Sequence, residues 1–197
     1  MKPTAIVLFV LVGMLSCKQQ PKTSVDGESN HPDYMEIGRE YAQETQKVLG
    51  KNLKTTIQNE GVAQAVVFCN EQAYPLTDSM ATHYKAKIKR VSDKPRNPSN
   101  KANPAELAHI NTFKEKVAKG DSIIPIVEEE NGKVHFYTPI ITQSLCLNCH
   151  GTPGKNIGPD VVGHLSELYP QDQAIGYDVD QVRGIWSIVF DAEKRSE

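Results

Sequence analysis

The feature that most constrains the fold of this 197-residue chain is a group of two cysteines and a histidine near residue 150. Cys146 and Cys149 are separated by two residues, and His150 follows directly. Cys-x-x-Cys-His is the attachment motif of c-type haem: the two thiols bond the vinyl groups, and the histidine ligates the iron. We therefore expect one covalent haem c, bound through Cys146 and Cys149, with His150 as an iron ligand.

Three other interpretations of this motif are possible. A thioredoxin-like redox pair needs a βαβ setting, which the surrounding sequence does not indicate. A structural zinc site needs four ligands, which would have to be Cys69, Cys146, Cys149 and His150. The adjacent positions of Cys149 and His150 make tetrahedral coordination awkward. A disulfide between Cys146 and Cys149 would be compatible with an oxidising compartment.

Cys69 is predicted to lie on the apolar stripe of a helix, so its thiol should face inward. It would then be either the sixth ligand of the iron or a small hydrophobic residue of the core. His164, the nearest histidine after the motif, is the strongest rival ligand. The full set of rivals is His83, His109, His135, His164, Met35 and Met80.

The N-terminus has the pattern of an export signal. Residues 5–15 form an apolar run that is too short to anchor a chain across a bilayer. The small residue before Cys17 resembles the cleavage site of bacterial lipoproteins. We expect a signal peptide over 1–16, diacylglycerol on Cys17, a flexible tether over 17–32 and a single haem domain over 33–197. A plain secretory signal with an incidental cysteine is the alternative, and both place the protein outside the cytoplasm.

Periodicity in the remaining sequence predicts helices first and an antiparallel sheet afterwards, which indicates an α+β fold. Gly61 should break the first helical pattern, and Pro75 should bend or end the second. The expected elements are helices over 33–59, 62–80 and 104–119, a loop over 90–104, a hairpin turning at Asn131-Gly132 and a strand over 184–190.

Four segments together resemble a known family. They are VVFCNEQA around Cys69, RVSDKPRNPSNKANPAE from Arg90, CLNCH, and LYPQDQAIGYDVDQVRGIWSI from Leu168. The pattern is similar to the single-haem, PAS-like c-type cytochrome domain known from cyanobacteria and from the sensor regions of some bacterial histidine kinases and chemoreceptors. This resemblance implies a PAS-like antiparallel sheet flanked by helices, with a long N-terminal helix. It also implies that Cys69 is the axial ligand opposite His150.

The expected function is one-electron transfer to a redox partner protein by a lipoprotein that is anchored to the membrane and faces the periplasm. Two bound axial ligands would leave the iron no open position, so we do not expect an enzyme. A redox or gas sensor that acts through a separate signalling protein is the alternative. The formal charge of −2 gives no indication of nucleic-acid binding.

Two arginines flank the proline-rich loop and could pair with the haem propionates. They are Arg90 and Arg96. Arginines in such a polar segment are more often solvated at the surface, and this interpretation is favoured for both.

Overall fold

The structure, a computed structural model, describes residues 33–191. The predicted signal peptide over 1–16, the tether over 17–32 and the lipid on Cys17 lie outside these residues and stay predictions. The described elements are α1 (Tyr34–Tyr84), β1 (Lys87–Val91), η1 (Pro98–Asn100), α2 (Pro104–Lys119), β2 (Ile126–Glu130), β3 (Lys133–Ile141), η2 (Ser144–Cys146), α3 (Leu147–His150), α4 (Pro159–Leu168) and β4 (Val182–Asp191).

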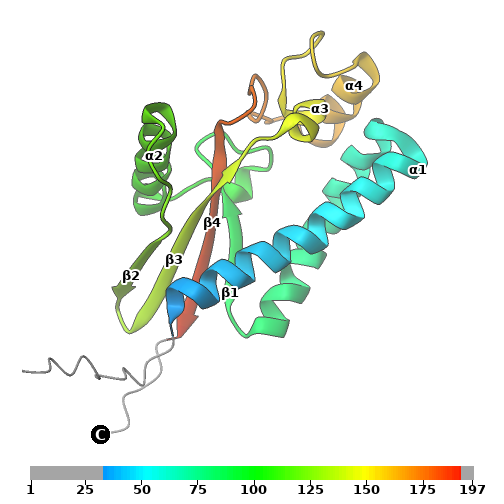
Figure 1. Ribbon diagram of the computed structural model, residues 1–197. Coiled ribbons are helices and arrows are strands. Elements are labelled where there is room, and N and C mark those ends of the chain that lie inside the picture. The colour runs from blue at the N-terminus through cyan, green and yellow to red at the C-terminus, as the bar shows by residue number, and fades with distance from the viewer. Residues whose placement is uncertain (1–32, 192–197) are drawn as a thin grey trace, which may run out of the picture. The chain divides into compact units, whose positions relative to one another are not determined.

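Helix α1 is a helical hairpin rather than one straight helix. Gly61 has φ 88° and ψ 172°, a conformation that glycine adopts without a steric penalty. It separates a first limb, residues 34–60, from a second limb, residues 62–84, which runs back beside the first (Figure 1). The predicted break at Gly61 is therefore confirmed, whereas Pro75 lies inside the second limb and does not end it.

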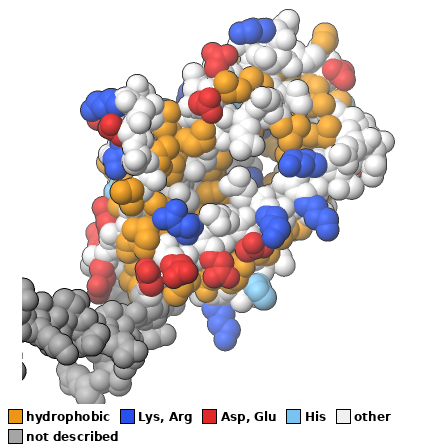
Figure 2. Space-filling view, in the orientation of Figure 1, with side chains coloured by type: hydrophobic (Ala, Val, Ile, Leu, Met, Phe, Trp, Pro, Cys, Tyr) orange, Lys and Arg blue, Asp and Glu red, His pale blue; other side chains and the backbone are white. Residues whose placement is uncertain are grey.

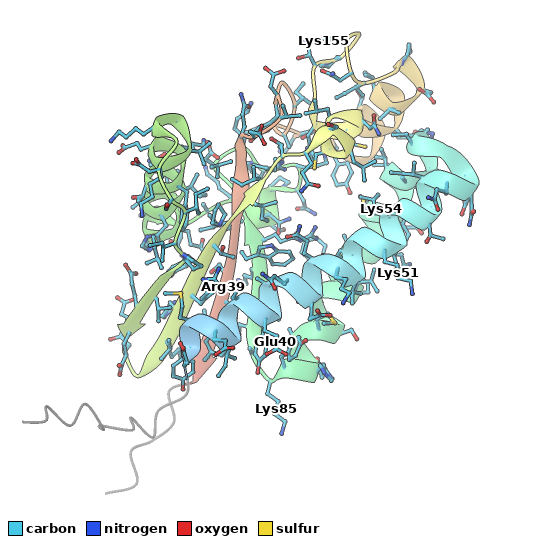
Figure 3. The ribbon with its side chains drawn as sticks, viewed as in Figure 1. Arg39, Glu40, Lys51, Lys54, Lys85 and Lys155 are labelled. Atoms are coloured by element: carbon cyan, nitrogen blue, oxygen red, sulfur yellow. The ribbon has the colours of Figure 1, made fainter. Side chains whose placement is uncertain are left out.

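The first limb is amphipathic. Gly38, Ala42 and Thr45 are buried on the side that faces the sheet. Charged side chains cover the opposite flank, where the space-filling view shows a row of acidic groups and, further along, a group of basic ones (Figure 2). The exposed residues labelled in Figure 3 on this limb are Arg39, Glu40, Lys51 and Lys54.

The four strands form one antiparallel sheet in the order β1-β4-β3-β2. The hairpin of β2 and β3 turns at Asn131 and Gly132, both with positive φ, as the type I′ turn requires. This hairpin, the helix over 104–119 and the last strand are confirmed. The predicted α+β fold class, with a long N-terminal helix and an antiparallel sheet flanked by helices, is also confirmed.

The sequence prediction did not include strand β1 or helix α4. Strand β1 includes Arg90 and Val91, so the predicted start of the loop over 90–104 is two residues too early. Its sequence, Lys-Ile-Lys-Arg-Val, is strongly charged, as is common for an edge strand, and this composition resembles a loop. Helix α4 begins at Pro159, a residue suited to the first helical turn, and buries Val161 and Leu165.

The sheet separates two apolar clusters. Helix α1 covers a cluster on one face that includes Phe136, Trp186 and Ile188. Helix α2 covers the other face, where Ile110 and Phe113 are fully buried. Figure 1 shows α1 and α2 on opposite sides of the strands. Within residues 33–191, no helix has both the length and the apolar character needed to cross a bilayer.

The contact of the first limb with the sheet leads to a prediction. A Cβ at Gly38 would lie 2.3 Å from Cγ of Phe136, so Gly38→Ala should reduce the free energy of unfolding by about 1–3 kcal/mol. Gly50→Ala is the matched control: a Cβ there meets nothing within 4 Å and should add about 0.5–1 kcal/mol of helix stability. Urea unfolding followed by circular dichroism measures both. Equal effects of the two substitutions would contradict the packing argument.

Candidate haem site

The Cys-x-x-Cys-His motif follows the central strand pair. Strands β3 and β4 pair as far as Ile141 and Val182, and the chain then forms η2 and α3, which carry the motif. Figure 1 places α3 and α4 together near the turn of the α1 hairpin. Cys146 and Cys149 are half-buried free thiols. Burial raises the pKa of the Cys149 thiol to about 11, against a lowering by the charge of Arg96.

The imidazole of His150 is oriented through its Nδ1 atom. Its Nδ1 lies 2.7 Å from the carbonyl oxygen of Ala174. Burial, followed by the positive charges of Arg183 and Arg96, holds the pKa of His150 well below its usual value, so the ring is neutral. Nδ1 also lies 3.4 Å from Nε of Arg183, so the much shorter contact with the Ala174 carbonyl assigns the proton to Nδ1. The lone pair of the neutral ring is then on Nε2. This is the protonation state that a metal-ligating histidine needs.

Arg96 fixes the carbonyl that receives this hydrogen bond. Its Nε donates to Oδ2 of Asp172 at 3.0 Å, and its Nη2 donates to the carbonyls of Cys149 and Ala174. The other carboxylate oxygen of Asp172 accepts the backbone N–H of Ala174 at 2.7 Å. The side chain of Arg96 is only 13% exposed. The interpretation of Arg96 as a solvated surface residue is therefore wrong.

Arg183 connects the start of β4 to the segment after β1. Its Nη1 donates to Oγ of Ser92 at 2.8 Å and to the carbonyl of Lys94 at 3.1 Å. The Ser92 hydroxyl in turn donates to the backbone carbonyl of Arg183 at 2.7 Å. Sequence reasoning assigned no role to Arg183, Ser92 or Asp172. No local pattern distinguishes them from other polar loop residues.

Cys69 lies on the second limb of α1, far from the motif in sequence, and is a half-buried free thiol. The limb packs through Val66 against α4, in an apolar cluster that also contains Cys149 and Tyr169. Burial raises the pKa of Cys69, and the charges of Arg90 and Arg96 oppose this rise. Cys69 also contributes to the raised pKa of Cys149, so folding brings the two thiols within electrostatic range of each other.

Most of the rival ligands lie elsewhere. Met35 and Met80 pack on the α1 side of the sheet, and His83 is exposed beside Tyr84. His109 contacts Glu128 at 3.1 Å, and the ring of His135 lies beside Tyr137. His164 is half-buried on α4, the helix that packs against the second limb of α1. It is the rival whose helix belongs to the apolar cluster that contains Cys149.

The other interpretations of the motif can be compared with this geometry. Among the described residues, no three side chains of the kinds His, Cys, Asp and Glu are grouped so that they could hold a metal ion. This counts against structural zinc. Cys69, Cys146 and Cys149 are all free, so the structure contains no disulfide between the motif cysteines.

The fold and the site define an α+β protein in which a Cys-x-x-Cys-His turn follows the central strands of a four-stranded antiparallel sheet, near the turn of a helical hairpin. The chain belongs to the Tll0287-like family, whose model matches residues 22–190. The crystal structure of the cyanobacterial heme-protein Tll0287 has a similar fold, with a TM-score of 0.61 and 18% identity. The similarity covers 84% of this chain and 99% of that chain. No curated protein matches the sequence.

The buried ion pair of Arg96 leads to a second prediction. Arg96→Met should reduce the free energy of unfolding by about 3–5 kcal/mol, because Asp172 would keep a buried charge without its partner. Lys47→Met is the control, since it removes an exposed ion pair with Glu44 and should change stability by at most about 0.5 kcal/mol. Denaturant unfolding measures both. A loss below 1 kcal/mol for Arg96→Met would contradict its role as a clamp.

Proposed function

We propose that this protein is a c-type cytochrome that carries one covalent haem and transfers single electrons. The observation that supports this most directly is the state of His150. Its Nδ1–H is held by the Ala174 carbonyl, and its Nε2 is left as a lone pair directly after two free thiols. Membership of the Tll0287-like family and a fold similar to that of a cyanobacterial heme-protein point the same way.

The residues of the site fit haem c. Cys146 and Cys149 would bond the vinyl groups, His150 would ligate the iron, and Cys69 would be the second axial ligand. The site also contains guanidinium groups in excess over carboxylates, which suits a group that carries two propionates. When bound, haem supplies a one-electron couple, and the protein orients it and sets its potential.

Electron transfer rather than catalysis follows from the ligand set. A thiolate ligand donates charge to iron and favours the oxidised state, so the reduction potential should be low. With both axial positions filled by protein, no position would be left for a substrate.

The location belongs to the same proposal. Covalent haem attachment takes place outside the cytoplasm, in agreement with the export signal expected at the N-terminus. A lipid on Cys17 would anchor the protein to the membrane, facing the periplasm. The redox partner would then be another extracytoplasmic or membrane protein.

Covalent attachment can be tested directly. When the chain is produced in a host with a cytochrome c assembly system, the wild type should have the mass of polypeptide plus one haem and a pyridine haemochrome spectrum. Cys146→Ser together with Cys149→Ser should lose both, because neither thioether can form. Cys69→Ser is the control, and it should keep the added mass. A wild-type protein without haem would refute the proposed function.

The second axial ligand can be tested on the same material. Cys69→Ala should keep the covalent haem but change the optical spectrum of the oxidised protein, because a sulfur ligand is removed. His164→Ala should leave the spectrum unchanged. The opposite result, a change with His164→Ala and none with Cys69→Ala, would assign the ligand to α4 instead.

A further inference from the structure

Arg90 is a desolvated cation to which the structure gives no anionic partner. It lies near the end of β1, opposite Trp186 on β4, and its guanidinium carbon is 5.9 Å from the indole centroid. Loss of water around the guanidinium lowers its pKa. Within residues 33–191, its side chain has no hydrogen bond and no ion pair. Arg90 is thus not a solvated surface arginine, which corrects the sequence interpretation.

A second donor beside Arg90 also has no acceptor. Trp186 is 2% exposed, and its Nε1 is a buried nitrogen without a hydrogen-bond partner in the described part of the chain. Leaving such a donor unpaired costs about 1–3 kcal/mol, so native structures usually provide an acceptor. Arg90 and Trp186 are cross-strand partners and extend from the same face of the sheet.

The position of Arg90 relates these donors to the candidate haem site. Its charge acts on Cys69 and on His150, the two expected axial ligands. Arg90 also lines a cavity of about 280 Å³ between the second limb of α1, β1 and η1, together with Tyr74 and Asn100. The guanidinium therefore borders this cavity and is close enough to Cys69 and His150 for its charge to act on both.

The other two arginines of the site already have partners. Arg96 binds the carboxylate of Asp172, and Arg183 binds Ser92 and the backbone of Lys94. Three guanidinium groups act on His150, and Asp172 is the carboxylate that pairs with one of them. A buried cation without a counterion is unfavourable, and a bidentate carboxylate compensates it well. Of these three arginines, Arg90 is the one whose guanidinium N–H groups are still available to bind an anionic ligand.

We propose that Arg90, with the indole N–H of Trp186, binds a propionate carboxylate of the haem. This inference rests on the proposed function, since the carboxylate belongs to the covalent haem. It assigns different roles to the two arginines that the sequence could not distinguish. Arg90 binds the cofactor, whereas Arg96 positions the loop that holds His150.

The test compares Arg90→Met with Lys89→Met in the haem-loaded protein. Methionine fills the space over the indole without a charge. Lys89 is exposed, precedes Arg90 on β1 and borders the same cavity, so its replacement removes an equal charge nearby. The readouts are haem content, the reduction potential at pH 8 and the propionate bending band in the resonance Raman spectrum.

We expect all variants to keep covalent haem. Arg90→Met should shift the propionate band and lower the reduction equilibrium constant about tenfold, which is about 59 mV for one electron, because a buried positive charge near the iron is lost. Lys89→Met should change neither readout appreciably. If Arg90→Met matches Lys89→Met in both, the proposal is overturned.

Two further outcomes keep this inference separate from the proposed function. If the wild type carries no haem, the proposed function fails first. If Arg90→Met does not yield loaded protein, Arg90→Lys decides the question. An ammonium offers no planar fork, so the propionate band should still shift, and an unchanged band would refute the role of Arg90.

Discussion

The geometry of the site depends on one hydrogen bond, from the imidazole of His150 to the carbonyl of Ala174. The ring must be neutral for Nε2 to keep a lone pair, and burial together with the nearby guanidinium groups keeps it neutral. The acceptor cannot move freely, since Asp172 binds the N–H of Ala174 and Arg96 binds Asp172. A histidine held in this way presents its other nitrogen in a fixed direction, as second-shell partners do at metal sites.

The same end of the sheet gathers positive charge. Arg90, Arg96 and Arg183 all act on His150, although they come from three separate segments of the chain. Each is accommodated differently: Arg96 by a carboxylate, Arg183 by a hydroxyl and a carbonyl, and Arg90 by the face of an indole. Three buried positive charges lower the stability of the polypeptide alone, and an anionic group beside them compensates this loss. The electrostatics therefore suit a cofactor with carboxylates.

Local signals predicted much of the fold. The break in α1 follows from Gly61, the hairpin turn from Asn131-Gly132, and the start of α2 from the capping box of Asn103 and Glu106. Strand β1 was not predicted because its charged residues are typical of a loop as well as of an edge strand. That β1 lies at the edge is known only from the strand order of the sheet. Helix α4 was not predicted because its apolar stripe is short. The stripe is recognisable as a buried face only once α4 packs against α1.

The sequence by itself determined that Cys146, Cys149 and His150 lie close together. They are separated by only a few peptide bonds, so any fold of the chain keeps them on one short segment. The tertiary structure decided that Cys69 comes close enough to Cys149 to raise its pKa and that Arg96 and Arg90 have different partners. Those relations depend on how the second limb of α1, the loop before β4 and the edge of the sheet pack together. Whether a charged side chain is buried, and which group it pairs with, depends on that packing and cannot be read from the type of residue.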